Sequence, residues 1–264
     1  MEIFEKLPDE INHLVSEFSS TPVVGDLSCG ITQYSFWLIV STIVLLIVLA
    51  VFKKKQTLVP KGFFVNGFEY IIEYVENDIG KGVVGENWKK HFPFLCSLFL
   101  FILINNMIGL IPGMKPGTGA IGSTAALAIF AFVYFIYYGC KAHGVIGYIK
   151  SLAPQGVSFP MNVLVWVVEL FSTFLRLITL AVRLFCNMFA GHVVMGSFAI
   201  MASMFMQPLL SAAHAVGALP SLAWLAILIL IYAIELVVGA IQAYVFTVLT
   251  AVYVSEAEEV AEEE

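Results

Sequence analysis

The chain has 264 residues, of which 60% are hydrophobic and only 12% are charged, and its formal net charge is −6. Soluble domains contain about 25% charged residues, so this composition excludes an ordinary soluble domain. It indicates a protein that buries most of its surface in lipid or against other membrane proteins.

The cysteines show neither a disulfide framework nor the spacing of metal ligands. Three of them, Cys96, Cys140 and Cys186, lie in apolar segments and are expected to be small apolar fillers. The chain also contains no glycine-rich phosphate loop and no nucleophile–base arrangement for covalent catalysis. We therefore expect no catalytic residue, no metal site and no cofactor.

Residues 1–33 form a polar and acidic leader before the first apolar stretch. A signal peptide would instead begin with positive charge and a short apolar core close to Met1, so no cleaved targeting segment is expected. The segment LPDEINHLVSEF places its apolar residues on one helical face, which predicts a short amphipathic helix. These residues are Leu7, Ile11, Leu14, Val15 and Phe18.

Residues 34–255 are predicted to form a single all-α, polytopic membrane domain with about five membrane helices, because a span needs about 20 apolar residues. The regions that meet this requirement are 34–52, 92–112, 120–140, 160–206 and 219–254. At about 1.5 Å per residue the last two are longer than a perpendicular crossing requires. Long helices tilted against a partner would explain this length, and so would a broken helix with a re-entrant turn.

Residues 63–79 predict a second amphipathic helix, which precedes the second span. Its apolar face consists of Phe64, Phe68, Ile71, Ile72, Val75 and Ile79. Its polar face is acidic and carries Glu69, Glu73, Glu76 and Asp78. Anionic lipid favours a basic face, so this helix is expected to dock on protein.

The lysines predict the orientation in the membrane. Nine of them lie in the loops between spans one and two and between spans three and four: Lys53, Lys54, Lys55, Lys61, Lys81, Lys89, Lys90, Lys141 and Lys150. Only Lys6 and Lys115 lie on the other side. Because basic loops stay inside, the amino terminus is expected outside and the carboxyl terminus inside. The acidic end, residues 256–264, is expected to be a solvated cytoplasmic tail.

The chain contains only two arginines, Arg176 and Arg183, and both lie in the fourth apolar region. A charge at bilayer depth costs about 2.5–3.5 kcal/mol on insertion scales and about 10–17 kcal/mol in simulations. A chain that keeps such a charge usually uses it. Arginine does not lose its proton in proteins, so a purely structural role is least expected for Arg183.

Polar residues form a stripe along the fourth region, because Glu169, Arg176 and Arg183 follow one another at intervals of seven residues. Seven residues return to nearly the same helical face after about 10.5 Å. This distance predicts that their ion-pair partners come from other helices or from water. Asn187 stays on the face of Arg183, whereas His192 lies half a turn away. The default hypothesis is an ion or proton path.

The last span carries its own polar pair, Glu235 and Gln242, again seven residues apart among Leu, Ile, Val and Ala. Structural roles stay open for several of these groups. Glu169, His192 and Gln242 could each make a structural hydrogen bond, and Arg176 could extend to the interface or pair with a carboxylate. Asn105 and Asn106, near the outer end of the second span, are expected to be helix-packing residues.

Two motifs of the chain, LRLITLAVRLFCNMFAGH (175–192) and IELVVGAIQAYVFTVLTAVYV (234–254), resemble subunit a of the membrane sector of F-type ATP synthase. The segment FPFLCSLFLFILINNMIGLIPG (92–113) is similar to the second span of that family. The similarity runs from about residue 34 to 255, and the two carboxyl-terminal motifs are highly specific together.

The resemblance implies that Arg183 faces the rotor ring of c subunits, with Asn187 and Gln242 beside it. It implies that His192 and Glu235 line the half-channel open to the outer side. Some relatives exchange the residue types at these two positions.

The resemblance also places Glu169 near the inner half-channel and Asn106 near the outer opening. Arg176 occupies a position that is often basic in the family, so the resemblance implies at most an auxiliary role for it.

Members of this family are non-catalytic stator subunits that translocate protons. Two offset half-channels and an essential arginine in them couple proton flow to c-ring rotation and ATP synthesis. The resemblance therefore implies the c-ring, the b-type subunits of the peripheral stalk and the lipid bilayer as partners, and no nucleic acid. The expected location is a bacterial plasma membrane, with the mitochondrial inner membrane as the alternative.

Two other classes of function could also use charged groups within the membrane. A secondary transporter could use the arginines to bind an anionic substrate, but such folds often contain paired repeats, and none is visible here. A haem or quinone subunit could use His192, but no second histidine is well placed within a span, since His91 and His143 lie near span ends.

Overall fold

The computed structural model describes residues 22–24, 31–56, 62–111, 113–151, 161–210 and 219–259. The α-helices in these ranges are α2 (Gln33–Lys55), α3 (Phe63–Tyr74), α4 (Trp88–Gly109), α5 (Ile121–Ser151), α6 (Met161–Leu210) and α7 (Leu219–Glu259). A π-helix, η1 (Val75–Val84), and a 3-10 turn, η2 (Gly85–Asn87), connect α3 to α4, and a second 3-10 turn, η3 (Gly117–Gly119), precedes α5. The strands β1 (Pro22–Val24) and β2 (Ile31–Thr32) form a small antiparallel pair before α2. The predicted all-α architecture is confirmed, and the amphipathic helix predicted near residues 7–18 lies outside the described residues.

Five helical segments are long and apolar enough to cross a membrane, as predicted. The helices α2, α4, α6 and α7 begin and end within about five residues of the expected spans. The second apolar segment is longer than predicted, because it runs from Phe63 through η1 and η2 to Gly109. Helix α5 is also longer, with 31 residues, and runs beyond residue 140. Gly144 bends this helix, since its φ of 72° lies in the left-handed region that favours glycine. The bend brings the ring of Tyr148 against Gly139, where an added Cβ would lie 2.5 Å from a ring carbon.

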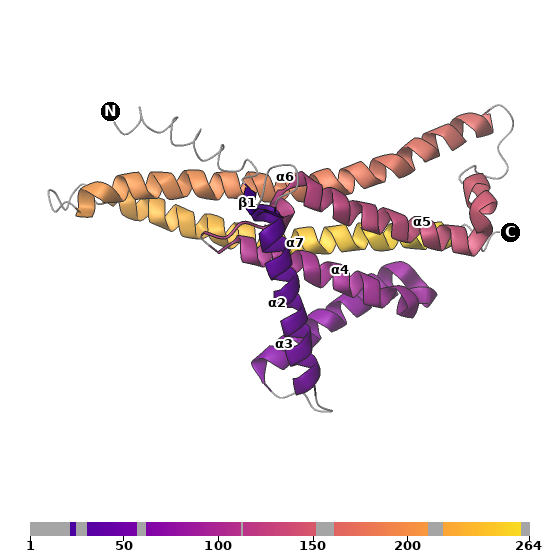
Figure 1. Cartoon of the computed structure of the whole chain (residues 1–264), viewed down its shortest axis with the longest axis horizontal. Coiled ribbons are helices and arrows are strands. Elements are labelled where there is room, and N and C mark those ends of the chain that lie inside the picture. Colours follow the sequence, from indigo (N-terminus) through magenta and orange to yellow (C-terminus); the bar gives the residue numbers. More distant parts are fainter. Residues whose placement is uncertain are drawn as a thin grey trace.

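Helices α6 and α7 are continuous over 50 and 41 residues, which corresponds to about 75 and 62 Å. The alternative of a broken helix with a re-entrant turn is therefore wrong. No proline lies between Met161 and Ser203 to remove a helical hydrogen bond. Figure 1 shows α6 and α7 lying side by side in opposite directions, and both run across the direction of α2.

Small residues let the helices of the bundle approach one another closely, which is the usual way that membrane helices pack. Ala128 and Ala131 of α5 and Ala243 and Ala251 of α7 are all fully buried. The larger core residues Ile102, Leu184 and Phe246, from α4, α6 and α7, fill the space between these contacts. The bundle core thus fixes α7 between α4, α5 and α6.

The segment predicted as an amphipathic helix over 63–79 is helical and packs on protein, as expected. Val75 and Ile79 are fully buried, and η1 contacts both α4 and α7. On the polar side, the Tyr244 hydroxyl of α7 donates a 2.5 Å hydrogen bond to Asp78. Phe64 is the exception on the apolar face, because it is exposed and stacks on Phe68 at the edge of this contact.

The predicted start of the solvated tail, residue 256, is too early in the chain. Helix α7 continues through Glu259, and Ala257 is buried. Glu256 and Glu258 form ion pairs with residues of α6 and α4, so these two carboxylates act as helix contacts. The prediction is wrong for residues 256–259 because it treated acidic composition alone as a sign of solvation, and residues 260–264 lie outside the described part.

Candidate functional site

Arg183 lies on the outward face of α6, beside the bundle core. Leu180, Leu184 and Met188 of the same helix are buried in the bundle. Arg183 is exposed, as are its neighbours Val182 and Cys186. The helix therefore presents this guanidinium on a surface that is mainly apolar.

No hydrogen bond or ion pair joins Arg183 to any residue within the described ranges. The adjacent outward residues Leu175, Ile178 and Val182 are large, apolar and exposed. A permanent charge on such a face is expensive in lipid. The face is therefore suited to a partner that brings a negative charge to Arg183.

Glu235 of α7 lies directly against α6 at Gly191. A Cβ added at Gly191 would lie 1.9 Å from Glu235 Oε1 and 2.3 Å from its Cδ, so the carboxyl group occupies the space that a side chain would need. Glu235 is only 8% exposed. His192, the next residue after Gly191, is half-buried. The structure thus brings Glu235 to the α6 turn that carries His192.

Three of the predicted polar residues hold buried atoms that have no hydrogen-bond partner among the described residues: Asn187 Nδ2, Glu235 Oε1 and Gln242 Nε2. Buried polar groups are normally hydrogen-bonded. The three residues come from both long helices, and Gln242 is only 7% exposed. Of the three, Glu235 is the one that lies directly against the other long helix, at Gly191.

Asn105 and Asn106 are both buried and satisfy the expectation that they pack helices together. Asn106 Nδ2 donates to the carbonyl of Gly239 on α7 at 2.9 Å, and its Oδ1 accepts from Thr118 at 3.0 Å. Asn105 Oδ1 accepts a 2.7 Å hydrogen bond from Ser41 of α2. Asn106 thus fixes α7 one turn after Glu235, and its predicted place near the outer opening stays a prediction.

Arg176 forms two ion pairs, one of which contradicts the spacing argument. Its Nη2 lies 3.3 Å from Glu169 Oε1 on the same helix, although a direct pair within the helix was predicted to be too long. The long arginine side chain spans most of the two-turn separation, because helical side chains lean toward the amino-terminal end. Its Nη1 lies 2.6 Å from Glu256 Oε2 of α7, and its guanidinium covers the Tyr253 ring at 4.8 Å. These residues, Glu169, Arg176, Tyr253 and Glu256, are called the Arg176 cluster.

The two long helices are thus joined at two levels, by Gly191 with Glu235 and by Arg176 with Glu256. Arg183 lies between these levels along α6. Sequence reasoning missed Gly191 and Glu256 as contact residues. Glu256 follows Gln242 by two further steps of seven residues, so the spacing of Glu235 and Gln242 already contained a signal for it.

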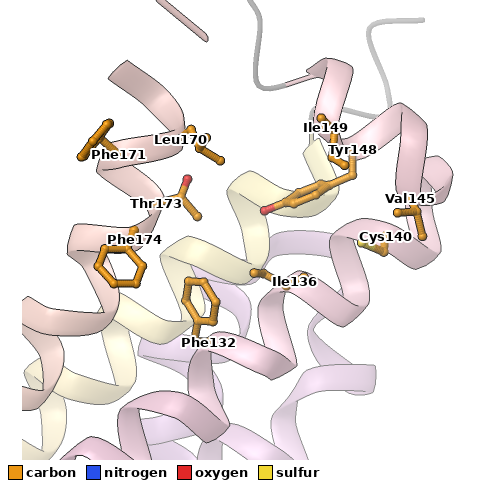
Figure 2. Close-up of a pocket in the computed structure, with 10 residues that line it drawn as sticks. All are labelled: Phe132, Ile136, Cys140, Val145, Tyr148, Ile149, Leu170, Phe171, Thr173 and Phe174. Atoms are coloured by element: carbon orange, nitrogen blue, oxygen red, sulfur yellow. The ribbon is translucent and has the colours of Figure 1, made fainter. Parts of the chain in front are cut away.

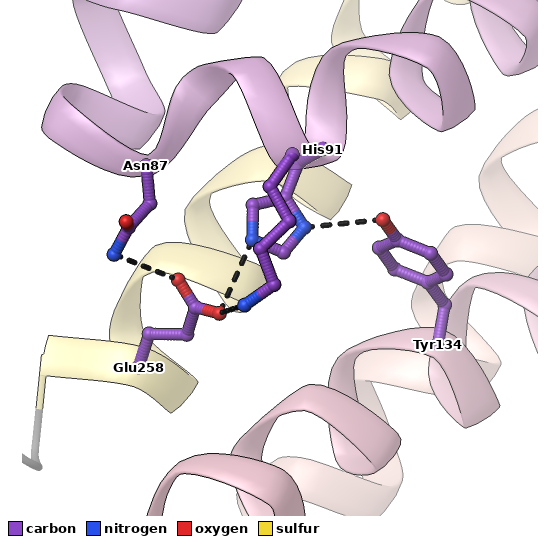
Figure 3. A network of polar contacts seen from close by, with 5 residues as sticks. Asn87, His91, Tyr134 and Glu258 are labelled. Carbon is purple, nitrogen blue, oxygen red and sulfur yellow. Dashed lines mark hydrogen bonds and ion pairs between the residues drawn. The ribbon is translucent and has the colours of Figure 1, made fainter.

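A second polar network joins the end of α7 to α4 and α5 (Figure 3). Glu258 pairs with Lys90 at 2.5 Å and with Nε2 of the fully buried His91 at 3.2 Å. The other His91 nitrogen, Nδ1, lies 3.1 Å from the Tyr134 hydroxyl. The network engages both ring nitrogens of His91 and anchors the carboxyl-terminal turn of α7.

We predict that Glu258→Ala lowers the stability of the chain by about 1–3 kcal/mol, because it leaves a buried histidine and a lysine without their shared acceptor. The melting temperature of the purified chain in detergent measures this effect. Glu86→Ala is the matched control, since Glu86 is an exposed carboxylate in the same region without an ion pair to a described residue. Equal melting temperatures for the two variants would contradict the anchoring role.

An apolar cavity of about 540 Å³ lies between α5 and α6, beside the Arg176 cluster (Figure 2). The polar groups in Figure 2 are the Tyr148 and Thr173 hydroxyls, and the latter donates to the carbonyl of Glu169 at 2.9 Å. The lining residues are Phe132, Ile136, Cys140, Val145, Tyr148, Ile149, Leu170, Phe171, Thr173 and Phe174. The cavity adds no charged side chain of its own to the site.

The fold and the site together define an integral membrane protein whose two longest helices carry a charged group outward and buried polar groups between them. A family model described as ATP synthase A chain matches residues 35–255. The chain belongs to this family, which confirms the resemblance seen in its motifs.

Curated relatives of the chain are named ATP synthase subunit a. The chain is 36% identical to the protein from Mesorhizobium japonicum, over 89% of this chain and 90% of the relative. It is 34% identical to the protein from Gluconobacter oxydans, over 92% of this chain and 95% of the relative. It is 33% identical to that of Chlorobium phaeobacteroides over 88% of this chain, and there it spans 66% of the relative's length.

Proposed function

We propose that the chain is the non-catalytic stator subunit of an F-type ATP synthase that carries protons between the two sides of the membrane and a rotating ring of c subunits. This proposal rests mainly on the position of Arg183. Its permanent charge is exposed on a mainly apolar helical face and forms no ion pair with any described residue. A ring whose subunits each bring one carboxyl group would supply the missing negative charge in turn.

Arg183 would act by favouring the ionised form of the rotor carboxyl group. A carboxylate facing lipid is costly, so each rotor carboxyl group stays protonated until it reaches the stator. Near the guanidinium the ionised form is stabilised, which promotes release of the proton. Arginine suits this role because it keeps its charge when it is desolvated, whereas lysine readily loses its proton.

Glu235 and His192 would form the outer half-channel, where protons reach the ring. Their support is the contact between Glu235 and the Gly191–His192 turn, together with the buried Glu235 Oε1. An imidazole and a carboxyl group can each accept and release a proton, so this pair would pass protons from one side of the membrane. Asn187 and Gln242 would hydrogen-bond water or rotor groups beside Arg183.

Glu169 would belong to the inner half-channel. It lies two steps of seven residues before Arg183 on α6, toward the end of the molecule where α7 terminates. The excess of lysines in two loops supports placing this end inside and the amino terminus outside. The membrane potential supplies about 2.3 kcal/mol per 100 mV for each charge that crosses the membrane. Because the half-channels are offset, a proton can cross only when the ring turns, so this energy drives rotation in one direction.

The proposed partners are the c-ring, the b-type subunits of the peripheral stalk and the lipid bilayer. The exposed apolar residues of α6 and α7, including Leu175, Ile178 and Ile241, offer a surface for the ring. The proposed location is a bacterial plasma membrane, since the curated relatives reported above come from bacteria.

Vesicles test the proposal directly. An ATP synthase assembled with this chain is expected to pump protons on addition of ATP, and the same complex without the chain is expected to hydrolyse ATP without pumping. A fluorescent pH indicator measures the difference. Uptake of an organic anion by the purified chain alone, together with no effect on pumping, would instead favour a secondary transporter.

A further inference from the structure

We propose that Glu256 is a proton-exchanging carboxylate at the inner mouth, which passes protons between the inner solution and Glu169 and is held in place by Arg176. This inference rests on the proposed function, because it assigns one more residue to the inner half-channel.

The first support is the sharing of one guanidinium by two carboxylates from different helices. Arg176 Nη1 lies 2.6 Å from Glu256, and Nη2 of the same group lies 3.3 Å from Glu169. Two carboxylates and one guanidinium carry a net charge of −1 when both acids are ionised. A single positive charge therefore leaves one negative charge of the cluster uncompensated when both acids are ionised.

The second support is the exposure of the two acids. The Glu256 side chain is 48% exposed and that of Glu169 is 38% exposed, whereas Arg176 between them is 22% exposed. Glu256 therefore meets the inner solution most openly. Exposed ion pairs contribute only about 0–1 kcal/mol to stability, so the pair is a weak explanation for the fold alone.

The third support is the position of Arg176 on the polar stripe of α6. It stands between Glu169 and Arg183, at intervals of about 10.5 Å. A lone arginine at this place would repel protons on their way to or from the rotor. Glu256 offsets this charge, and the Tyr253 ring packs against the guanidinium at 4.8 Å. The Tyr148 side chain of α5 lies near the same three charged groups, Arg176, Glu169 and Glu256.

The proposed step moves a proton only and involves no redox change. During ATP-driven pumping a proton from the inner solution binds the Glu256 carboxylate and forms the neutral acid. The acid then gives the proton to the Glu169 carboxylate and becomes ionised again. Arg176 stays charged throughout, because it cannot release its own proton.

Inverted vesicles, whose inner face meets the medium, provide the test with the whole complex. Glu256→Gln keeps an oxygen that can accept from Arg176 but cannot exchange protons. We expect it to lower the rate of ATP-driven proton uptake several-fold. As the medium pH is raised, the uptake rate of the variant should begin to fall at a lower pH than that of the wild type. A mobile buffer such as imidazole in the medium should restore much of the rate, because it replaces the lost proton carrier.

Two further variants make the result decisive. Glu256→Ala removes both the proton exchange and the contact with Arg176, and Glu86→Gln makes the same charge change at an exposed site and should pump like the wild type. The inference is overturned if Glu256→Gln matches the wild type in rate and pH profile. It is also overturned if both Glu256 variants lose the same activity without rescue by buffer, because that outcome indicates a structural clamp. Pumping that survives Arg183→Ala would instead defeat the proposed function itself.

Discussion

Arg183→Ala is expected to abolish ATP-driven proton pumping while the complex stays assembled. The rotor carboxyl group would lose the charge that stabilises its ionised form. Breaking a desolvated ion pair costs about 3–5 kcal/mol, which at about 1.4 kcal/mol per factor of ten corresponds to a loss of at least about a hundredfold in rate. Acidification of vesicles and copurification with the c-ring measure the two parts of this prediction.

The expected loss is functional and not structural, because Arg183 forms no ion pair or hydrogen bond with a described residue. The melting temperature of Arg183→Ala should therefore equal that of the wild type or exceed it. Arg183→Lys tests whether any positive charge suffices, and we expect it to pump far less than the wild type because a desolvated lysine can lose its proton. Pumping at wild-type rate by the alanine variant in an assembled complex would refute the role of Arg183.

Gly191→Ala is expected to give the second largest effect, through the outer half-channel. The added methyl group would lie 1.9 Å from Glu235 Oε1, so either the carboxyl group or the two helices must move. Overpacking of this kind costs about 1–3 kcal/mol, which corresponds to a loss of about fivefold to a hundredfold in proton flux if the displaced group is Glu235. Passive proton flow through the assembled membrane sector measures the loss.

Gly122→Ala is the matched control, because nothing lies within 4 Å of a Cβ added there. A second variant locates the cause. The double variant that combines Gly191→Ala with Glu235→Asp should recover part of the proton flux. The aspartate side chain is shorter, so its carboxyl group lies farther from the added methyl group. Normal flux in Gly191→Ala alone would show that Glu235 does not depend on this contact.

Hydropathy predicted the five membrane helices because a bilayer demands long apolar segments whose backbone groups are satisfied internally. It could not distinguish a continuous α6 from a broken one, since both have the same composition. The absence of proline between residues 161 and 203 was the local signal for continuity. The expected α5 is too short because the polar segment 141–144 interrupts the apolar run, whereas in the fold the helix continues beyond it and Tyr148 packs on Gly139.

The acidic end shows the opposite error. Glu256 and Glu258 appeared to belong to a solvated tail because charge was considered without its partners. Their partners are Arg176 and the pair Lys90 and His91, which lie about 80 and 168 residues away along the chain. Contacts over such separations have no trace in local composition, so only the folded bundle reveals them.

The sequence by itself determined that this is a polytopic helical membrane protein, and its motifs indicated the family, because the cost of polar groups in lipid leaves a strong record in composition and spacing. It also singled out Arg183 as the least replaceable charge. The tertiary structure alone decided which groups meet: Glu235 against Gly191, Arg176 between Glu169 and Glu256, and Arg183 exposed between these two contacts. Those outcomes depend on how α6 and α7 pack in opposite directions, and helix packing is set by the whole interface rather than by any local stretch of residues.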